Sequence, residues 1–202
     1  MKQVLIAATL ALAAASAFAA ATVGQPAPTF TAVDTAGKTV SLADFKGKHV
    51  VLEWVNPGCP FVVKHYNSAN MQGTQKEAAA KGVVWLAINS TATEAGDFKP
   101  PAAMAQWMQG QKGAATATLM DADGKVGKAY GARTTPHMYI INPTGTLVYA
   151  GAIDSKPTSN IADIPGATNH VKVALAESLA GKPVSAATTR PYGCSVKYAS
   201  GA

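Results

Sequence analysis

The chain has 202 residues, of which 48% are hydrophobic, and a formal net charge of +6. This composition favours a globular fold over disorder, and the length suits one domain with a sizeable core. The lysines are scattered, without a dense basic run or interleaved aromatic residues, so we expect no nucleic-acid partner.

Residues 1–21 have the features of a secretory signal peptide. Lys2 supplies a positive charge, residues 4–15 form an uncharged apolar run, and residues 17–19 and 19–21 each fit the small-x-small pattern of a cleavage site. The run is too short and too rich in alanine to favour a membrane anchor. We therefore expect a cleaved protein that is periplasmic or otherwise exported and has no membrane attachment.

Alternating apolar and polar segments follow the signal. Their order predicts an α/β domain at residues 22–181, with a central mixed sheet flanked by helices on both faces, and a tail at residues 182–202. The predicted elements are an extended segment at 22–34, a short element at 39–48, strands at 49–55, 83–89, 116–120, 138–141 and 146–150, and helices at 60–81, 102–109, 125–130 and 167–180.

Two cysteines, Cys59 and Cys194, remain after the predicted cleavage. Export would place them in an oxidising compartment, where disulfides persist. A structural staple, a redox pair and two separate thiols all fit a spacing this long, so the spacing leaves the pairing open.

Cys59 lies between a predicted strand and a predicted helix. Residues 56–58 break the strand, and Pro60 suits the first turn of the helix. The amide groups and the dipole of a helix N-terminus favour a thiolate, which is the nucleophile of disulfide exchange. The alternative is a buried, unreactive cysteine.

Three segments resemble thioredoxin-fold proteins: residues 50–61 around Cys59, residues 131–142, and residues 144–151. The nearest family is the exported, peroxiredoxin-like redoxins of the AhpC/TSA type. The resemblance implies a thioredoxin-like fold in which Cys59 is the nucleophile. It implies that Pro136 is a cis-proline beside the sulfur, next to an edge open to substrate, and that Glu53 is a buried acid that relays protons. The remaining candidate substrate contacts are Thr135 and His137, which flank Pro136, and Pro60, which follows Cys59.

The chain departs from the family patterns at several positions. Val62 stands where the second cysteine of a CxxC motif would be, so a disulfide of Cys59 requires Cys194 or a partner protein. Two alternatives stay open for Cys194, a resolving cysteine for Cys59 and a permanent staple of the tail. Leu52, Asn56 and Pro136 occupy the positions at which peroxiredoxins have Pro, Thr and Arg. The nearby Arg133 is only a loose substitute for that arginine.

The sequence predicts no metal and no cofactor. A copper site would use a second cysteine at the position of Val63, and His65 is expected to pack or to lie at the surface. The predicted function is an exported thiol–disulfide oxidoreductase. Its partners would be a disulfide-bearing protein, or a small thiol or peroxide, and an unidentified electron donor. The alternatives are a peroxiredoxin-like peroxidase and a non-enzymatic protein with a structural Cys59–Cys194 disulfide.

Overall fold

A computed structural model describes residues 20–199. The predicted signal peptide at residues 1–21 therefore lies outside the described residues, apart from its last two alanines. Among residues 20–199, no helix has both the length and the apolar character that crossing a membrane demands.

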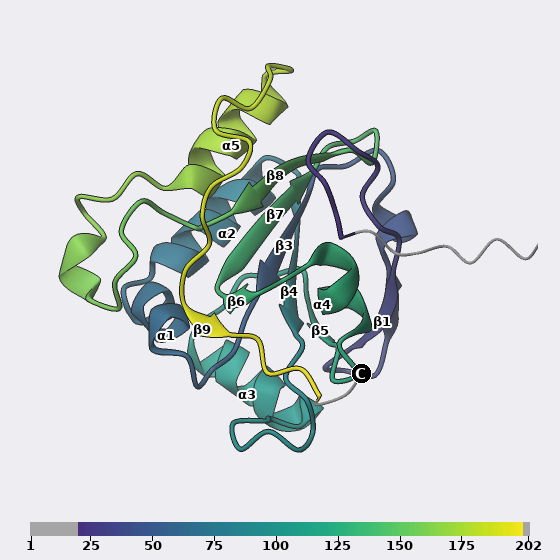
Figure 1. Cartoon of the computed structure of the whole chain (residues 1–202), viewed down its shortest axis with the longest axis vertical. Helices are drawn as coiled ribbons and strands as arrows, with labels where there is room; N and C mark the ends of the chain where they lie inside the picture. Colours follow the sequence, from purple (N-terminus) through teal and green to yellow (C-terminus); the bar gives the residue numbers. More distant parts are fainter. Residues whose placement is uncertain (1–19, 200–202) are drawn as a thin grey trace, which may run out of the picture.

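A seven-stranded mixed sheet forms the centre of the molecule, in the order β2-β1-β5-β4-β3-β7-β8 (Figure 1). Strands β3, β4 and β5 are mutually parallel, while β1, β7 and β8 run antiparallel to their neighbours. The predicted class, an α/β domain with a central mixed sheet, is thus confirmed. The strands are β1 (Thr31–Asp34), β2 (Thr39–Ser41), β3 (Val50–Trp54), β4 (Val84–Asn89), β5 (Ala117–Met120), β6 (Thr134–Thr135), β7 (His137–Ile141), β8 (Leu147–Gly151) and β9 (Cys194–Ser195).

Helices cover both faces of the sheet. One apolar cluster contains residues of α1, α2, α3 and α5, and the cluster on the opposite face contains residues of α4 and of the N-terminal segment. Strands β3 and β4 are buried along their whole length because each face meets one of these clusters. The helices are α1 (Pro60–Asn67), α2 (Asn70–Ala80), α3 (Pro101–Gly110), α4 (Lys125–Tyr130) and α5 (His170–Leu179), with 3-10 helices at Leu42–Phe45 and Ile161–Asp163.

The continuous helix predicted at residues 60–81 is wrong. The structure divides it into α1 and α2, and the residue between them, Ala69, has the left-handed φ of 59°. No glycine or proline marks this break, and its local signal is the run from Asn67 to Asn70, whose asparagines and serine favour turns and helix ends. Residues 31–41, predicted as extended chain, a turn and a short run, form the β1–β2 hairpin.

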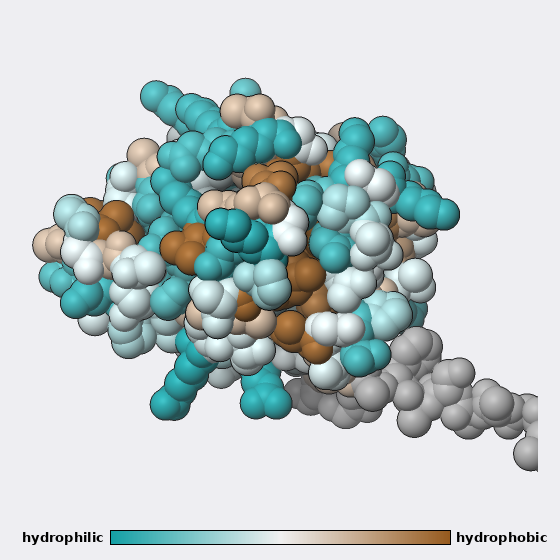
Figure 2. Space-filling view, turned by 90° about the horizontal axis from the view of Figure 1, so that it is seen from above, coloured by the Kyte–Doolittle hydropathy of each residue, from teal (hydrophilic) through white to brown (hydrophobic). Residues whose placement is uncertain are grey.

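The tail after α5 runs back across the molecule (Figure 1, yellow). It first lies along β8, where Thr188 bridges Ala150 in parallel. Further on it forms β9, which pairs with β6 away from the main sheet. Figure 2 shows mainly hydrophilic residues on the face seen from above, with small groups of hydrophobic residues between them.

Candidate functional site

Cys59 is the residue immediately before helix α1. Its backbone is extended, with φ −88° and ψ 120°, and Pro60 begins the helix with its fixed φ. The preceding loop is held by Asn56, whose side-chain oxygen accepts from the Gly58 amide at 2.7 Å and whose amide donates to Asp97 at 2.9 Å. The sulfur therefore sits at the positive end of the α1 dipole, in a loop fixed by side-chain hydrogen bonds.

The thiol of Cys59 is buried, at 1% exposure, and donates to the carbonyl oxygen of Thr135 at 3.0 Å. Thr135 precedes Pro136, and the peptide bond between them is cis, as the resemblance implies. The structure thus brings Cys59, Thr135 and Pro136 together, although 76 residues separate the first two in sequence.

Strand β9 carries Cys194 to the same place. Cys194 is the antiparallel partner of Thr135, and Ser195 is the partner of Thr134. Burial raises the pKa of the Cys194 thiol to about 12, and a hydrogen bond with Cys59 and the charge of Cys59 add to that effect. Both cysteines are free thiols in the structure, and they are neighbours.

Gly193 permits this close approach of the tail. Its φ is 129°, and a Cβ built on it would lie 2.0 Å from the Thr135 carbonyl oxygen, well inside van der Waals contact. Any side chain at residue 193 would therefore push β9 away from β6. The packing requires glycine at this position, but a single glycine in the sequence does not predict which strand the tail meets.

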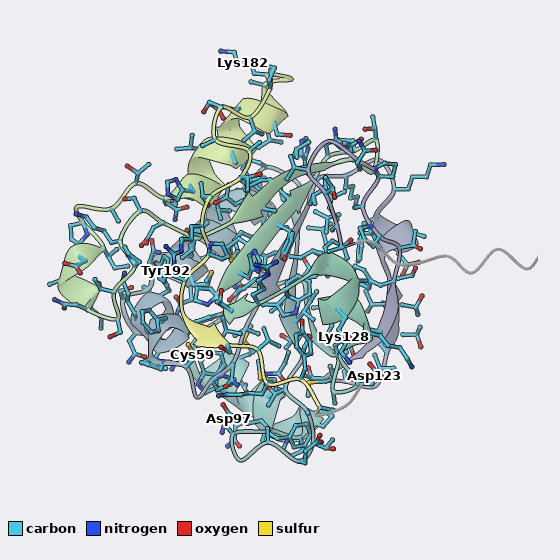
Figure 3. All side chains as sticks on the ribbon, in the orientation of Figure 1. Cys59, Asp97, Asp123, Lys128, Lys182 and Tyr192 are labelled. Carbon is cyan, nitrogen blue, oxygen red and sulfur yellow. The ribbon has the colours of Figure 1, made fainter. Side chains whose placement is uncertain are left out.

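Tyr192 anchors the tail just before Cys194 (Figure 3). Its hydroxyl donates to Asp154 at 2.5 Å and lies 3.1 Å from His65 Nε2, and its ring packs edge-on against Phe61 of α1. Lys64, buried at 1% exposure, approaches the same carboxylate at 3.7 Å. Sequence reasoning missed this polar cluster because its members come from α1, the segment after β8, and the tail.

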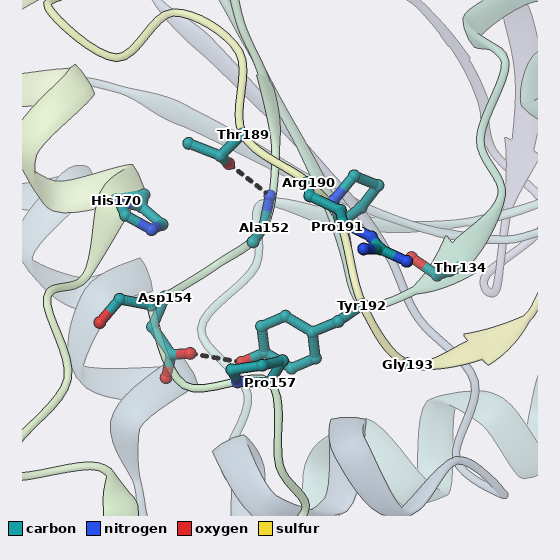
Figure 4. Close-up of a pocket in the computed structure, with 11 residues that line it drawn as sticks. Thr134, Ala152, Asp154, Pro157, His170, Thr189, Arg190, Pro191, Tyr192 and Gly193 are labelled. Carbon is teal, nitrogen blue, oxygen red and sulfur yellow. Dashed lines mark hydrogen bonds between the residues drawn. The ribbon is translucent and has the colours of Figure 1, made fainter.

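A cavity of about 690 Å³ lies beside this anchor (Figure 4). Its wall includes the Tyr192 ring, Gly193 and the backbone at Thr134, and Arg190 points toward Thr134 in the close-up. The cavity therefore opens next to β9, on the side of the tail that precedes Cys194.

Glu53 is fully buried in the middle of β3, on the sheet face that carries the Cys59 cluster. Three donors surround its carboxylate: Tyr66 at 2.9 Å, Gln75 at 3.0 Å and Trp85 at 2.7 Å. Burial raises its pKa from 4.5 to about 7, and the hydrogen bonds oppose that rise. A carboxyl group with this pKa is partly protonated at neutral pH. Sequence reasoning did not find its three donors.

His137 lies on the opposite face of the sheet from Cys59. It is the cross-strand partner of Trp54, and its ring packs 4.5 Å from that of Tyr139. Burial first, and Arg133 second, lower its pKa to about 4, so the imidazole is neutral at pH 7. Its side chain therefore faces away from the sulfur and forms no part of the Cys59 site. Pro60 is exposed at the start of α1.

Within the part of the chain that the structure describes, no three His, Cys, Asp or Glu side chains gather as ligands would. His65, next to Lys64, is buried at 0% exposure and has its pKa lowered to about 4, chiefly by burial. It packs within the protein, which agrees with one of the two expectations for it.

Comparison with known proteins gives a consistent picture. Residues 23–150 match the model of the AhpC/TSA family. The thiol-disulfide oxidoreductase ResA of Bacillus subtilis (strain 168) is 30% identical over 132 residues, which cover 62% of this chain and 64% of the relative. The chain thus spans less than two thirds of the length of that curated relative.

Solved structures extend the likeness to nearly the whole chain. An uncharacterized conserved protein from Geobacillus kaustophilus matches with a TM-score of 0.77, 28% identity, and coverage of 90% of this chain and 94% of the other. A hypothetical protein from Sinorhizobium meliloti 1021 matches with a TM-score of 0.76, 25% identity, and coverage of 91% and 98%. A structure described as a thioredoxin from Neisseria meningitidis gives 0.50 and 27%, covering 61% and 77%. The fold is thioredoxin-like.

Proposed function

The chain belongs to the AhpC/TSA family of thioredoxin-fold redoxins, and from that premise we propose that it is an exported thiol–disulfide oxidoreductase whose redox pair is Cys59 and Cys194. One observation carries the proposal: Cys194 is the strand partner of Thr135, the residue whose carbonyl accepts the Cys59 thiol. Val62 occupies the position of the second CxxC cysteine, so the second cysteine of the proposed pair is Cys194, in the tail strand β9.

The proposed reaction is reversible exchange of two electrons with a partner disulfide. When the pair is oxidised, a sulfur–sulfur bond forms between Cys59 and Cys194, and the partner's disulfide bond breaks. The two thiol protons of the pair go to the two partner sulfurs, which leave as thiols. The relative from Bacillus subtilis, described as a thiol-disulfide oxidoreductase, supports this reaction class.

We assign Glu53 the part of a proton carrier within this pair. Its carboxyl group is fully buried on the Cys59 side of the sheet, and its pKa of about 7 suits both uptake and release of a proton. Thr135 and Pro136 would hold Cys194 beside the Cys59 sulfur, through the pairing of β6 with β9. Export to the periplasm is part of the proposal, and it rests on residues 1–21.

The test is a redox titration of the protein in glutathione buffers. We expect both thiols to disappear together, with a Cys59–Cys194 disulfide found by peptide mass spectrometry and a potential above about −300 mV. A potential below about −300 mV would favour a permanent staple over a working pair. Consumption of hydrogen peroxide by the wild type and not by Cys59→Ser would instead favour a peroxidase.

A further inference from the structure

Strand β9 covers the sulfur of Cys59. Cys59 is 1% exposed, whereas Cys194 is only half-buried and its neighbour Ser195 is exposed. The β6 edge, which would receive an extended peptide, is already paired with β9. In this arrangement the protein's own tail occupies the place of a substrate strand.

The tail is held on both sides of Cys194. Before it, Tyr192 donates to the buried Asp154, and the Thr189 hydroxyl accepts from the Ala152 amide at 2.9 Å. After it, the Val196 amide donates to the Arg133 carbonyl at 3.0 Å.

Still further on, the Ala92 amide donates to the Lys197 carbonyl at 2.8 Å, and the Tyr198 hydroxyl donates to the Ala132 carbonyl at 2.8 Å. Displacing β9 would break these bonds together, so an approaching partner meets β9 and its cysteine in place.

From this geometry, and resting on the function proposed above, we propose that a reducing partner attacks the oxidised pair at Cys194, so that the mixed disulfide forms on the tail cysteine and Cys59 is released. The partner's thiolate forms a new bond to the Cys194 sulfur. The bond between Cys194 and Cys59 breaks, and its electron pair stays on Cys59 as a thiolate.

A dithiol partner completes the cycle. The partner's second thiolate attacks the partner's first sulfur in the mixed disulfide. This forms the partner's disulfide and releases Cys194 as a thiolate. Cys194 and Cys59 then each take up one proton, which balances the two protons that the partner's thiols released when they became thiolates. The partner is oxidised by two electrons, and the pair is reduced by two.

The leaving-group chemistry points the same way as the accessibility. Cys59 leaves at the positive end of α1, where the helix dipole favours its anion. Burial chiefly, and the neighbouring Cys59 next, raise the pKa of Cys194, so an anion on Cys194 is disfavoured. A disulfide splits faster when the better-stabilised thiolate leaves.

The experiment uses oxidised wild-type protein and reduced glutathione as the attacking thiol. After a brief reaction the mixture is quenched with acid, alkylated with N-ethylmaleimide, and digested for mass spectrometry. We expect glutathione on Cys194 and the alkyl group on Cys59 in at least about nine tenths of the trapped molecules. That is about a tenfold preference for Cys194, which requires a difference of only about 1.4 kcal/mol between the two barriers. Glutathione found mainly on Cys59 would overturn the inference and leave the proposed function standing.

A second arm tests the cover itself with Gly193→Ala, because the added Cβ would collide with the Thr135 carbonyl. We expect the variant to place a larger share of glutathione on Cys59. The matched control is Gly181→Ala, which introduces alanine at a φ of 69° with open space around its Cβ. The control should keep the wild-type distribution, and a Gly193→Ala protein with native circular dichroism and that same distribution would contradict the cover.

The two proposals fail in different ways. A protein that keeps two free thiols throughout the glutathione titration has no redox pair, which overturns both. A protein that forms the disulfide but carries glutathione on Cys59 keeps the function and loses only the order of attack.

Discussion

Glu53 makes the stability of the fold depend on pH at the scale of one residue. Its pKa is raised from 4.5 to about 7, chiefly by burial. Between those two values the folded protein retains a proton that the unfolded chain releases. The contribution of Glu53 to the free energy of unfolding should therefore fall as the pH rises from about 4.5 to 7 and then level off, by about 3 kcal/mol in total.

Glu53→Gln should remove that contribution, since the amide does not titrate, so the free energy of unfolding of the wild type relative to the variant should fall as the pH rises from 5 to 8. Urea unfolding at pH 5, 6, 7 and 8 measures it. The control is Glu77→Gln, the same change on an exposed side chain that pairs with Lys172. An unchanged slope in Glu53→Gln together with a changed slope in Glu77→Gln would show that another group is responsible.

The hydroxyl of Tyr192 is a second residue-scale test. Tyr192→Phe removes the donor to Asp154 and leaves a buried carboxylate with fewer partners. We expect a loss of about 1–3 kcal/mol of unfolding free energy. Tyr198→Phe, which removes a donor to the neutral carbonyl of Ala132, should lose less. Equal losses in a urea titration would argue against a special role for the buried carboxylate.

Side-chain direction was hard to predict at this scale. Cys59 was identified from the strand and helix that flank it, and Glu53 from the resemblance to thioredoxin-fold proteins. His137 follows Pro136 in sequence, yet its side chain points to the other sheet face, because it pairs with Trp54. That face depends on the register between β3 and β7, and a one-residue shift of register would reverse it.

The break between α1 and α2 gives a prediction at the scale of elements. Ala69 has a φ of 59°, a left-handed conformation that costs an L-residue about 1–2 kcal/mol. Ala69→Gly should therefore raise the free energy of unfolding by up to about 1 kcal/mol, because glycine relieves the strain but gains disorder when unfolded. Thermal and urea unfolding measure the change.

The contrasting variant is Ala105→Gly in the interior of α3. The same substitution there should lower the free energy of unfolding by about 1 kcal/mol, since no strain offsets the lost helix propensity. If both variants were destabilised alike, the left-handed conformation at Ala69 would be contradicted.

At the element scale, the buried strands were the most predictable parts. Strands β3, β4 and β5 are short apolar runs that meet a cluster on each face, so their composition alone marks them. The place of β9 was not predictable. Two residues pair with β6 only because the tail is anchored by residues such as Tyr192 and Thr189, whose partners lie far away in sequence.

At the scale of the whole molecule, the tail covers two strand edges. Its residue Thr189 donates its amide to the Ala150 carbonyl of β8, and the Ala150 amide donates to the Ala187 carbonyl. Gly151 gives it room, since a Cβ there would lie 2.1 Å from the Thr189 hydroxyl oxygen. Without the tail, β8 would be an open edge at one end of the sheet, and open edges favour pairing between molecules.

Deleting residues 184–202 should therefore do two things. It should lower the free energy of unfolding by at least about 3 kcal/mol, from several lost hydrogen bonds of about 1 kcal/mol each. It should also cause self-association, visible by light scattering at increasing concentration. Thr189→Ala is the control, because it removes the bonds to Ala152 and Tyr149 but keeps the strand in place. That variant should be less stable yet monodisperse, and a truncated protein that scatters light no more than Thr189→Ala would refute the tail's role as an edge cover.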